Sequence, residues 1–230
     1  AVKVERVGVN ELSVAQAEIE GIVSAVTASG FTIGNQVVAT TGSTRYEGGV
    51  FGDIAVGTKL EAEGSISGGV LTATKVSFRD AVRLEGDIAS ISGGTLTLSG
   101  LPGVTVNVTS ITELKNVASI GALAVGNHLR IRGKLGSNGA VGASQVEMRS
   151  TSPDTRVELQ APASVVTPET SVTLLGVTVA TGNVSSYKNL SDTQISKAEF
   201  FTAAKVGTLI KARGTLSAGA VTWSELQLEN

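Results

Sequence analysis

One glycine-containing phrase occurs three times in this chain, and no other feature constrains the fold as strongly. The phrase is Val-Gly, an aliphatic residue three positions later, and a second glycine four positions after that. Its copies begin at Val56, Val125 and Val206. The closing glycines, Gly64, Gly133 and Gly214, lie 69 and 81 residues apart. These periods are too long for a solenoid unit and are typical of tandem small domains. The sequence therefore predicts three copies of one small domain.

Within each copy, apolar residues alternate with polar ones and glycines separate the runs. This pattern is typical of β-strands joined by hairpins. In the first copy we expect five strands, at residues 18–28, 31–33, 36–41, 59–66 and 70–78. The connector between the third and fourth strands matches the order of an OB-like barrel. We predict an all-β chain of three tandem OB-like five-stranded barrels, with a short helix in the third.

The predicted domains are an N-terminal strand and linker at 1–16 and barrels at 17–80, 81–150 and 151–230. Gly21 and Gly86 interrupt the first strands of two copies, where glycine permits the bend that lets one strand serve both sides of a barrel. Ala161-Pro162 takes this place in the third copy. Because proline donates no backbone hydrogen bond, this strand is expected to begin irregularly or on an edge.

The connector is longest in the third copy and carries a helix signal. Ser196 and Glu199 have the spacing of a capping box, and Phe200 and Phe201 follow at once. This pattern predicts a short helix over 197–205 that plugs the end of the third barrel.

Alignment of the three copies predicts the core, because equivalent residues are expected to be buried together. The predicted core positions are Ile19, Leu60, Leu71 and Val76, then Leu84, Leu129, Val141 and Val146, then Leu159, Ile210, Val221 and Leu226. Trp223 stands where the other copies have Ala73 and Ala143. We expect its ring to pack near Phe200 or Phe201; an exposed ring would make it a candidate ligand contact.

Composition excludes several kinds of site. The chain has no cysteine, which excludes disulfides and thiolate metal ligands, and its 18 basic and 20 acidic residues give a net charge of −2. His128 is the only histidine, so neither an ordinary zinc site nor a hydrolase triad can be assembled. Because His128 aligns with Lys59, we expect a solvated strand side chain. We predict no catalytic, cofactor-binding or metal-binding residue.

A basic stripe runs along the second copy through Arg130, Arg132 and Lys134, next to His128. OB-like barrels often bind single-stranded nucleic acid on such faces, but that binding also uses aromatic platforms for stacking. The second copy has no Phe, Tyr or Trp between Ala81 and Ser150. Nucleic-acid binding is therefore the alternative and not the leading hypothesis.

Residues 1–6 match the closing strands of the other copies, such as Ala73-Thr74-Lys75-Val76. A lone closing strand leaves backbone groups available for pairing. We expect this segment to be extended and to pair with the third copy or with a neighbouring molecule. We also expect the gene to encode more chain upstream.

The phrase Ala-Val-Gly-x-x-Leu-x-x-x-Gly, the Gly-Gly turn and the segment Val70–Val76 resemble a bacterial domain-of-unknown-function family of tandem OB-like repeats. The resemblance is strong in the first two copies and weaker in the third, where Ala161 and Trp223 depart from it. It implies an exported protein, periplasmic or lipid-anchored at the outer membrane, with no established activity. It assigns no functional residue.

These observations favour a non-enzymatic structural or binding module of the bacterial envelope, without a cofactor and without a transmembrane segment. The expected ligand is a protein or a glycan. The candidate contact residues are Arg130, Arg132, Lys134 and Trp223.

Overall fold

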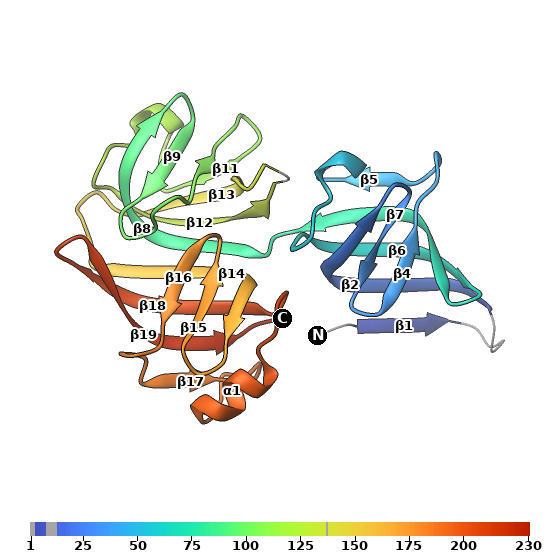
Figure 1. The fold of residues 1–230 in the computed structure, drawn as a ribbon. Helices are drawn as coiled ribbons and strands as arrows, with labels where there is room; N and C mark the ends of the chain where they lie inside the picture. Colours follow the sequence, from blue (N-terminus) through green and yellow to red (C-terminus); the bar gives the residue numbers. More distant parts are fainter. Residues whose placement is uncertain (1–2, 8–12, 137) are drawn as a thin grey trace. The chain divides into compact units, whose positions relative to one another are not determined.

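The computed structural model describes residues 3–7, 13–136 and 138–230, which form two compact units, Ala1–Arg79 and Asp80–Asn230. The architecture is all-β, as predicted, with one short α-helix (Figure 1). None of the helices in the described ranges has the length and apolar character needed to cross a membrane.

The first unit contains the first copy of the repeat. Its strands are β1 (Lys3–Val7), β2 (Ser13–Thr27), β3 (Gly30–Ile33), β4 (Gln36–Ala39), β5 (Arg45–Glu47), β6 (Lys59–Ser67) and β7 (Val70–Arg79), with a 3-10 turn at Phe51–Asp53. Strand β2 pairs with β6 up to Ile22 and with β3 from Val23. One long first strand therefore pairs with two different strands along its length, as the sequence predicts. Strand β4 pairs in parallel with β7, and β6 pairs with both β7 and β2.

The second unit contains the other two copies. The second copy comprises β8 (Val82–Ser92), β9 (Thr95–Leu98), β10 (Val106–Asn107), β11 (Glu113–Lys115), a 3-10 turn at Ile120–Ala122, β12 (His128–Leu135) and β13 (Val141–Ser150). The third comprises β14 (Arg156–Thr167), β15 (Ser171–Leu174), β16 (Val177–Ala180), β17 (Ser186–Lys188), α1 (Lys197–Ala203), β18 (Leu209–Ser217) and β19 (Ala220–Leu228).

The second and third copies share one sheet and one core. Strand β8 pairs with β12 on one side and β14 on the other, and Leu84 is opposite both Ile131 and Leu159. Of the two expectations for Ala161-Pro162, the irregular start is wrong, because β14 pairs with β18 without a register shift from Arg156 to Pro162. The edge position is not contradicted, because these two residues pair with β18 alone. Pro162 lies opposite Leu209 inside a ladder, and the bulge follows it, after Ala163. Strand β8 pairs only with Glu158–Gln160 of β14, so among the described strands Pro162 has a partner on one side only, where its missing amide is tolerated.

The Val-Gly phrase forms a tight turn in all three copies. The amide of Thr58 donates to the carbonyl of Ala55 at 3.0 Å, and Gly57 has a φ of 94°. This geometry belongs to a type II turn, whose third residue favours glycine. The amide of Gly57 also donates to Val23, which fixes the turn on the first strand.

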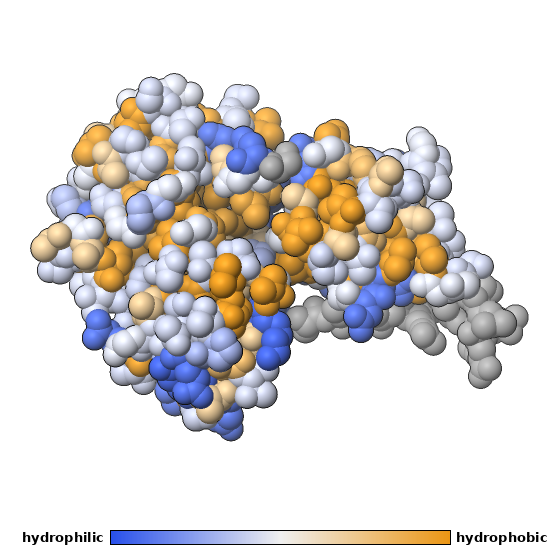
Figure 2. All heavy atoms as spheres, in the orientation of Figure 1, coloured by the Kyte–Doolittle hydropathy of each residue, from blue (hydrophilic) through white to orange (hydrophobic). Residues whose placement is uncertain are grey.

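The valine of each turn does not enter the core. Val56, Val125 and Val206 are 56%, 64% and 66% exposed. Figure 2 shows apolar side chains at the surface of both units. The turn is therefore repeated for its backbone geometry and not for burial of its valine.

The second glycine of the phrase sits at a β-bulge in each copy. A Cβ atom on Gly64, Gly133 or Gly214 would lie 2.0, 2.4 or 2.6 Å from the carbonyl oxygen of the partner strand. No side chain fits at these positions, which explains why the glycine recurs in all three copies.

Gly133→Ala is expected to lower the free energy of unfolding of the second unit by about 1 to 3 kcal/mol, because its Cβ would overlap the carbonyl of Gly142. The matched control is Gly142→Ala, whose Cβ would meet nothing closer than 3.9 Å and should change stability by less than about 0.5 kcal/mol. Urea unfolding followed by Trp223 fluorescence measures both. Equal stabilities of the two variants would contradict the bulge explanation.

The predicted core is confirmed at eleven of its twelve positions, and the exception is Val221, which is half-buried. The predicted helix is also confirmed and ends at Ala203, two residues early. Ser196 and Glu199 form its capping box, and Phe200 packs against Tyr187 with ring centroids 5.5 Å apart.

The N-terminal segment is extended from Lys3 to Val7, as predicted, but its expected partner is wrong. Strand β1 pairs with β2 of the first unit, with Val4 opposite Ile19. On β8 the equivalent residue, Leu84, is opposite Leu159 of β14. Strand β1 therefore takes the same place on β2 that β14 takes on β8. Ala1 and Val2 lie outside the described residues.

Candidate functional site: a groove beside Trp223

The third copy is open where the other two are paired. In the first copy β4 and β7 join through three residue pairs, and in the second β10 and β13 join through two. The corresponding strands of the third copy are β16 and β19. In the part of the chain that the structure describes, β16 pairs only with β15.

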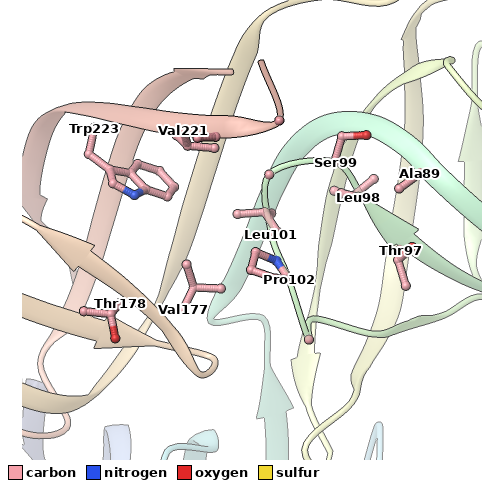
Figure 3. A pocket seen from close by; sticks show the side chains of 14 residues that line it. Ala89, Thr97, Leu98, Ser99, Leu101, Pro102, Val177, Thr178, Val221 and Trp223 are labelled. Atoms are coloured by element: carbon pink, nitrogen blue, oxygen red, sulfur yellow. The ribbon is translucent and has the colours of Figure 1, made fainter. Parts of the chain in front are cut away.

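A groove of about 510 Å³ lies at this opening (Figure 3). One wall comes from β16 and β19 of the third copy, through Val177, Thr178, Val221 and Trp223. The other comes from the second copy, through β9 and the loop at 99–103. None of the lining residues carries a charge, and the side-chain polar groups are the hydroxyls of three of them and the indole N–H.

Trp223 is 7% exposed, so the prediction that it is buried is confirmed, and it belongs to the same core cluster as its predicted neighbours Phe200 and Phe201. Its ring lies in the groove beside Val177 and Thr178 (Figure 3). Phe200 makes ring contacts with Tyr187 and Phe201. Trp223 stands where the other copies have Ala73 and Ala143, and this difference was the sequence signal for the site. The missing pairing between β16 and β19 could not be predicted from the sequence.

The loop at 99–103 packs directly against the third copy. Gly100 has a φ of 80°, and a Cβ on it would lie 2.5 Å from Cγ2 of Val221. Leu101 is fully buried in the shared core. Both walls of the groove are thus fixed by packing within one unit.

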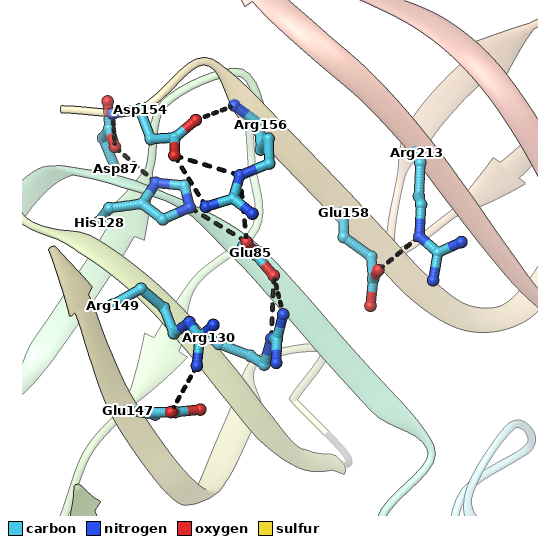
Figure 4. A network of polar contacts seen from close by, with 10 residues as sticks. All are labelled: Glu85, Asp87, His128, Arg130, Glu147, Arg149, Asp154, Arg156, Glu158 and Arg213. Carbon is cyan, nitrogen blue, oxygen red and sulfur yellow. Dashed lines mark hydrogen bonds and ion pairs between the residues drawn. The ribbon is translucent and has the colours of Figure 1, made fainter. Parts of the chain in front are cut away.

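The basic stripe is only partly available for a ligand. Arg130 is half-buried, and its Nε and Nη2 atoms lie 2.9 and 2.8 Å from Oε2 of Glu85 (Figure 4). Arg132 is exposed and Lys134 is half-buried. All three basic residues lie on β12, but the side chain of Arg130 already forms an ion pair with Glu85.

His128 is fully buried, so the expectation of a solvated side chain is wrong. Its Nδ1 lies 2.8 Å from Oδ1 of Asp87, and its Nε2 lies 3.3 Å from Oε1 of Glu85 (Figure 4). The alignment with Lys59 was correct, since Lys59 pairs with Glu20 in the equivalent place. What differs is the segment after β13, where the amide of Asp154 donates to Asp87 and closes this face.

Two carboxylates of this cluster, those of Glu85 and Asp154, have lowered pKa values. Burial raises the pKa of Glu85, but hydrogen bonds from Arg130 and His128 outweigh it and hold the pKa below its usual value. Hydrogen bonds from the side chain and the amide of Arg156 lower the pKa of Asp154 to about 2. An ionised carboxylate cannot donate a proton as a general acid.

The cluster therefore joins the second copy to the segment that leads into the third. Glu85 and Asp87 come from β8 and His128 and Arg130 from β12, while Asp154 follows β13. Within the described ranges no group of three or more His, Cys, Asp or Glu residues could hold a metal ion. A function is better sought at the groove.

Residues 20–77 and 85–147 each match the model of one protein family, described as Domain of unknown function (DUF5666). The two matches cover just over half of the chain, and the groove lies partly in the unmatched third copy. No curated protein and no solved structure matches the chain.

Proposed function

This chain belongs to the DUF5666 family, a domain of unknown function, and we propose that it is a non-enzymatic binding module. Its ligand lies in the groove beside Trp223, and it is a segment of a protein or a glycan. The observation that carries this proposal is the open side of the third copy, which leaves a groove where the other copies have a strand pair.

The strand arrangement within each copy supports a ligand in the groove. We propose that each copy is OB-like, because the first strand serves both neighbours and the third and fifth strands of the first two copies pair in parallel. OB-folds bind oligomeric ligands on the face of the second and third strands and at the loop between the fourth and fifth. In the third copy β16 and the turn at Gly219 occupy those places, and both line the groove.

The lining indicates an uncharged ligand. Ligand pockets have volumes of roughly 300 to 1,000 Å³ and combine apolar walls with a few polar groups. Here the apolar wall includes Val177 and Trp223, and the hydroxyls come from Thr97, Ser99 and Thr178. A phosphate or carboxylate would find no countercharge among these residues.

The test follows Trp223 fluorescence, because this is the only tryptophan. A panel of neutral oligosaccharides and uncharged peptides is titrated against the protein. A saturable change is expected for at least one class, and Thr178→Arg should weaken it at least tenfold by blocking the groove. The control is Thr222→Arg, an exposed position on β19 outside the groove. Equal affinities of both variants, or no ligand in the panel, would refute the proposal.

Single-stranded nucleic acid is the alternative ligand, and the exposed Arg132 beside Lys134 favours it. Binding of this kind loses affinity steeply with salt, since phosphate contacts release counterions. Oligothymidylate binding that collapses between low and physiological salt and is removed by Arg132→Ala would support it. Arg130→Ala is not used here, because that change would unpair Glu85.

We further propose that the protein is exported and acts in the bacterial envelope, in the periplasm or anchored to the outer membrane. The motif resemblance supports this location. Fractionation of cells that express the full gene tests it, and recovery in the cytoplasmic fraction would contradict it.

A further inference from the structure

We infer that the groove takes an extended polypeptide, which adds as a strand to the edge of β19 in the third copy. This inference rests on the proposed binding function and chooses peptide over glycan. It is carried by the backbone of the opening, because a strand edge offers a row of hydrogen-bonding groups that only another extended backbone matches in full.

Internal alignment identifies the missing ladder. Strands β3 and β4 pair with the same register as β15 and β16, so Val38 is equivalent to Val179. Along the fifth strand, Leu71 is equivalent to Val141 and Val221. In the first copy Val38 is paired with Leu71. The equivalent pair of the third copy, Val179 with Val221, is not formed.

The second copy indicates which backbone amide of β19 is available to a ligand in the third copy. There the amide of Val141 donates to the carbonyl of Thr105 at 2.8 Å. By the same register, the amide of Val221 points out of the β18–β19 hairpin toward the groove. Val221 lines the groove and is half-buried. On this edge of β19, β17 pairs only with Glu225–Gln227, and no described strand pairs with the part around Val221.

Trp223 explains why the ladder cannot close. In the first two copies the inward residue of this strand is an alanine, buried at Ala73 and Ala143. In the third copy the indole occupies this position and lies between β19 and Val177 of β16 (Figure 3). A large ring that is itself buried in the core holds the two strands apart, so the opening is a built feature of the fold.

The lining defines the peptide. It holds no charge, and burying a charged side chain without a partner is costly. The partner is therefore a short extended segment of uncharged, small or β-branched residues. The sequence Gly34–Thr41 is uncharged, is small or β-branched except at Asn35 and Gln36, and contains the strand that forms the equivalent ladder in the first copy.

The experiment uses a synthetic octapeptide of that sequence and the intact protein. Trp223 fluorescence reports binding, and amide hydrogen exchange reports protection at Val221. A second peptide carries N-methyl groups on alternate residues, which remove backbone donors and leave the side chains unchanged. We expect the first peptide to bind and to slow exchange at Val221 at least tenfold. The N-methylated peptide should bind at least tenfold more weakly.

Two variants test the same point from the protein. Val221→Pro removes the amide that the proposal uses, and a strand edge is where proline is tolerated. Val221→Ala keeps the amide and is the matched control. We expect Val221→Pro to lose at least tenfold in peptide affinity and Val221→Ala less than threefold. If Val221→Pro fails to fold, the comparison of the two peptides on the unaltered protein still decides.

The outcomes separate this inference from the function on which it rests. If a neutral oligosaccharide changes Trp223 fluorescence and the peptide does not bind, strand addition is refuted and the binding function stands. If both peptides bind equally, the ligand docks by its side chains and strand addition is again refuted. If neither sugars nor peptides bind, both proposals fall.

Discussion

Replacing Leu129 with alanine is expected to lower the free energy of unfolding of the second unit by about 2 to 5 kcal/mol, since truncating a buried leucine loses apolar burial and leaves a cavity. Leu129 is fully buried in the core that the second and third copies share. Urea unfolding monitored by Trp223 fluorescence gives the value, because Trp223 belongs to the same core.

The matched control is Val125→Ala, four residues earlier in the same phrase. Val125 is 64% exposed, so its truncation should cost less than about 0.5 kcal/mol. A loss below about 0.5 kcal/mol for Leu129→Ala would mean that the register of the repeat is wrong.

Glu85→Gln is expected to destabilise the second unit by about 3 to 5 kcal/mol, the usual cost of breaking a buried charge pair by removing one partner. The change keeps the shape of the side chain but leaves Arg130 and the buried His128 without their shared carboxylate. The control is Glu147→Gln on β13, which breaks a more exposed pair with Arg149 and should cost at most about 1 kcal/mol. Equal losses in the two variants would contradict a structural role for the cluster.

The pH dependence of this effect has a definite sign. Because the pKa of Glu85 is lower in the folded protein than its unfolded value of about 4.3, its contribution is present above that value. The contribution is lost as the pH falls through the folded pKa. Urea unfolding at pH 7 and at stepwise lower pH should therefore show the difference between the protein and Glu85→Gln shrinking in acid. A difference that stays constant would mean that the charge of Glu85 is not responsible.

Much of the architecture could be predicted because it depends on local rules. The turn at Gly57 requires a positive φ, and the bulge at Gly64 excludes a side chain, so both glycines recur with the repeat. Alternation along the strands then identified the buried face, including Leu129 and Ile210. The helix after Ser196 was readable for the same reason, since a capping box is a local signal.

The candidate site was predictable only in part. Trp223 stood out because it replaces an alanine in an otherwise repeated phrase. The environment of His128 was predicted wrongly, although its alignment with Lys59 was right. Alignment of the copies compares equivalent residues. It contains no information on a segment outside the repeated phrases that covers one of them, here the stretch around Asp154.

The sequence by itself determined the three copies, their strand order, their core positions and the residue that departs from the pattern. These follow from turn geometry, side-chain alternation and steric exclusion, which act over a few residues. Only the tertiary structure decided that β8 and β14 join two copies into one sheet, that His128 lies between two carboxylates and that the third copy is open at β16 and β19. Those features depend on which distant backbone edges meet and on how much space one buried indole occupies, and no local rule contains either.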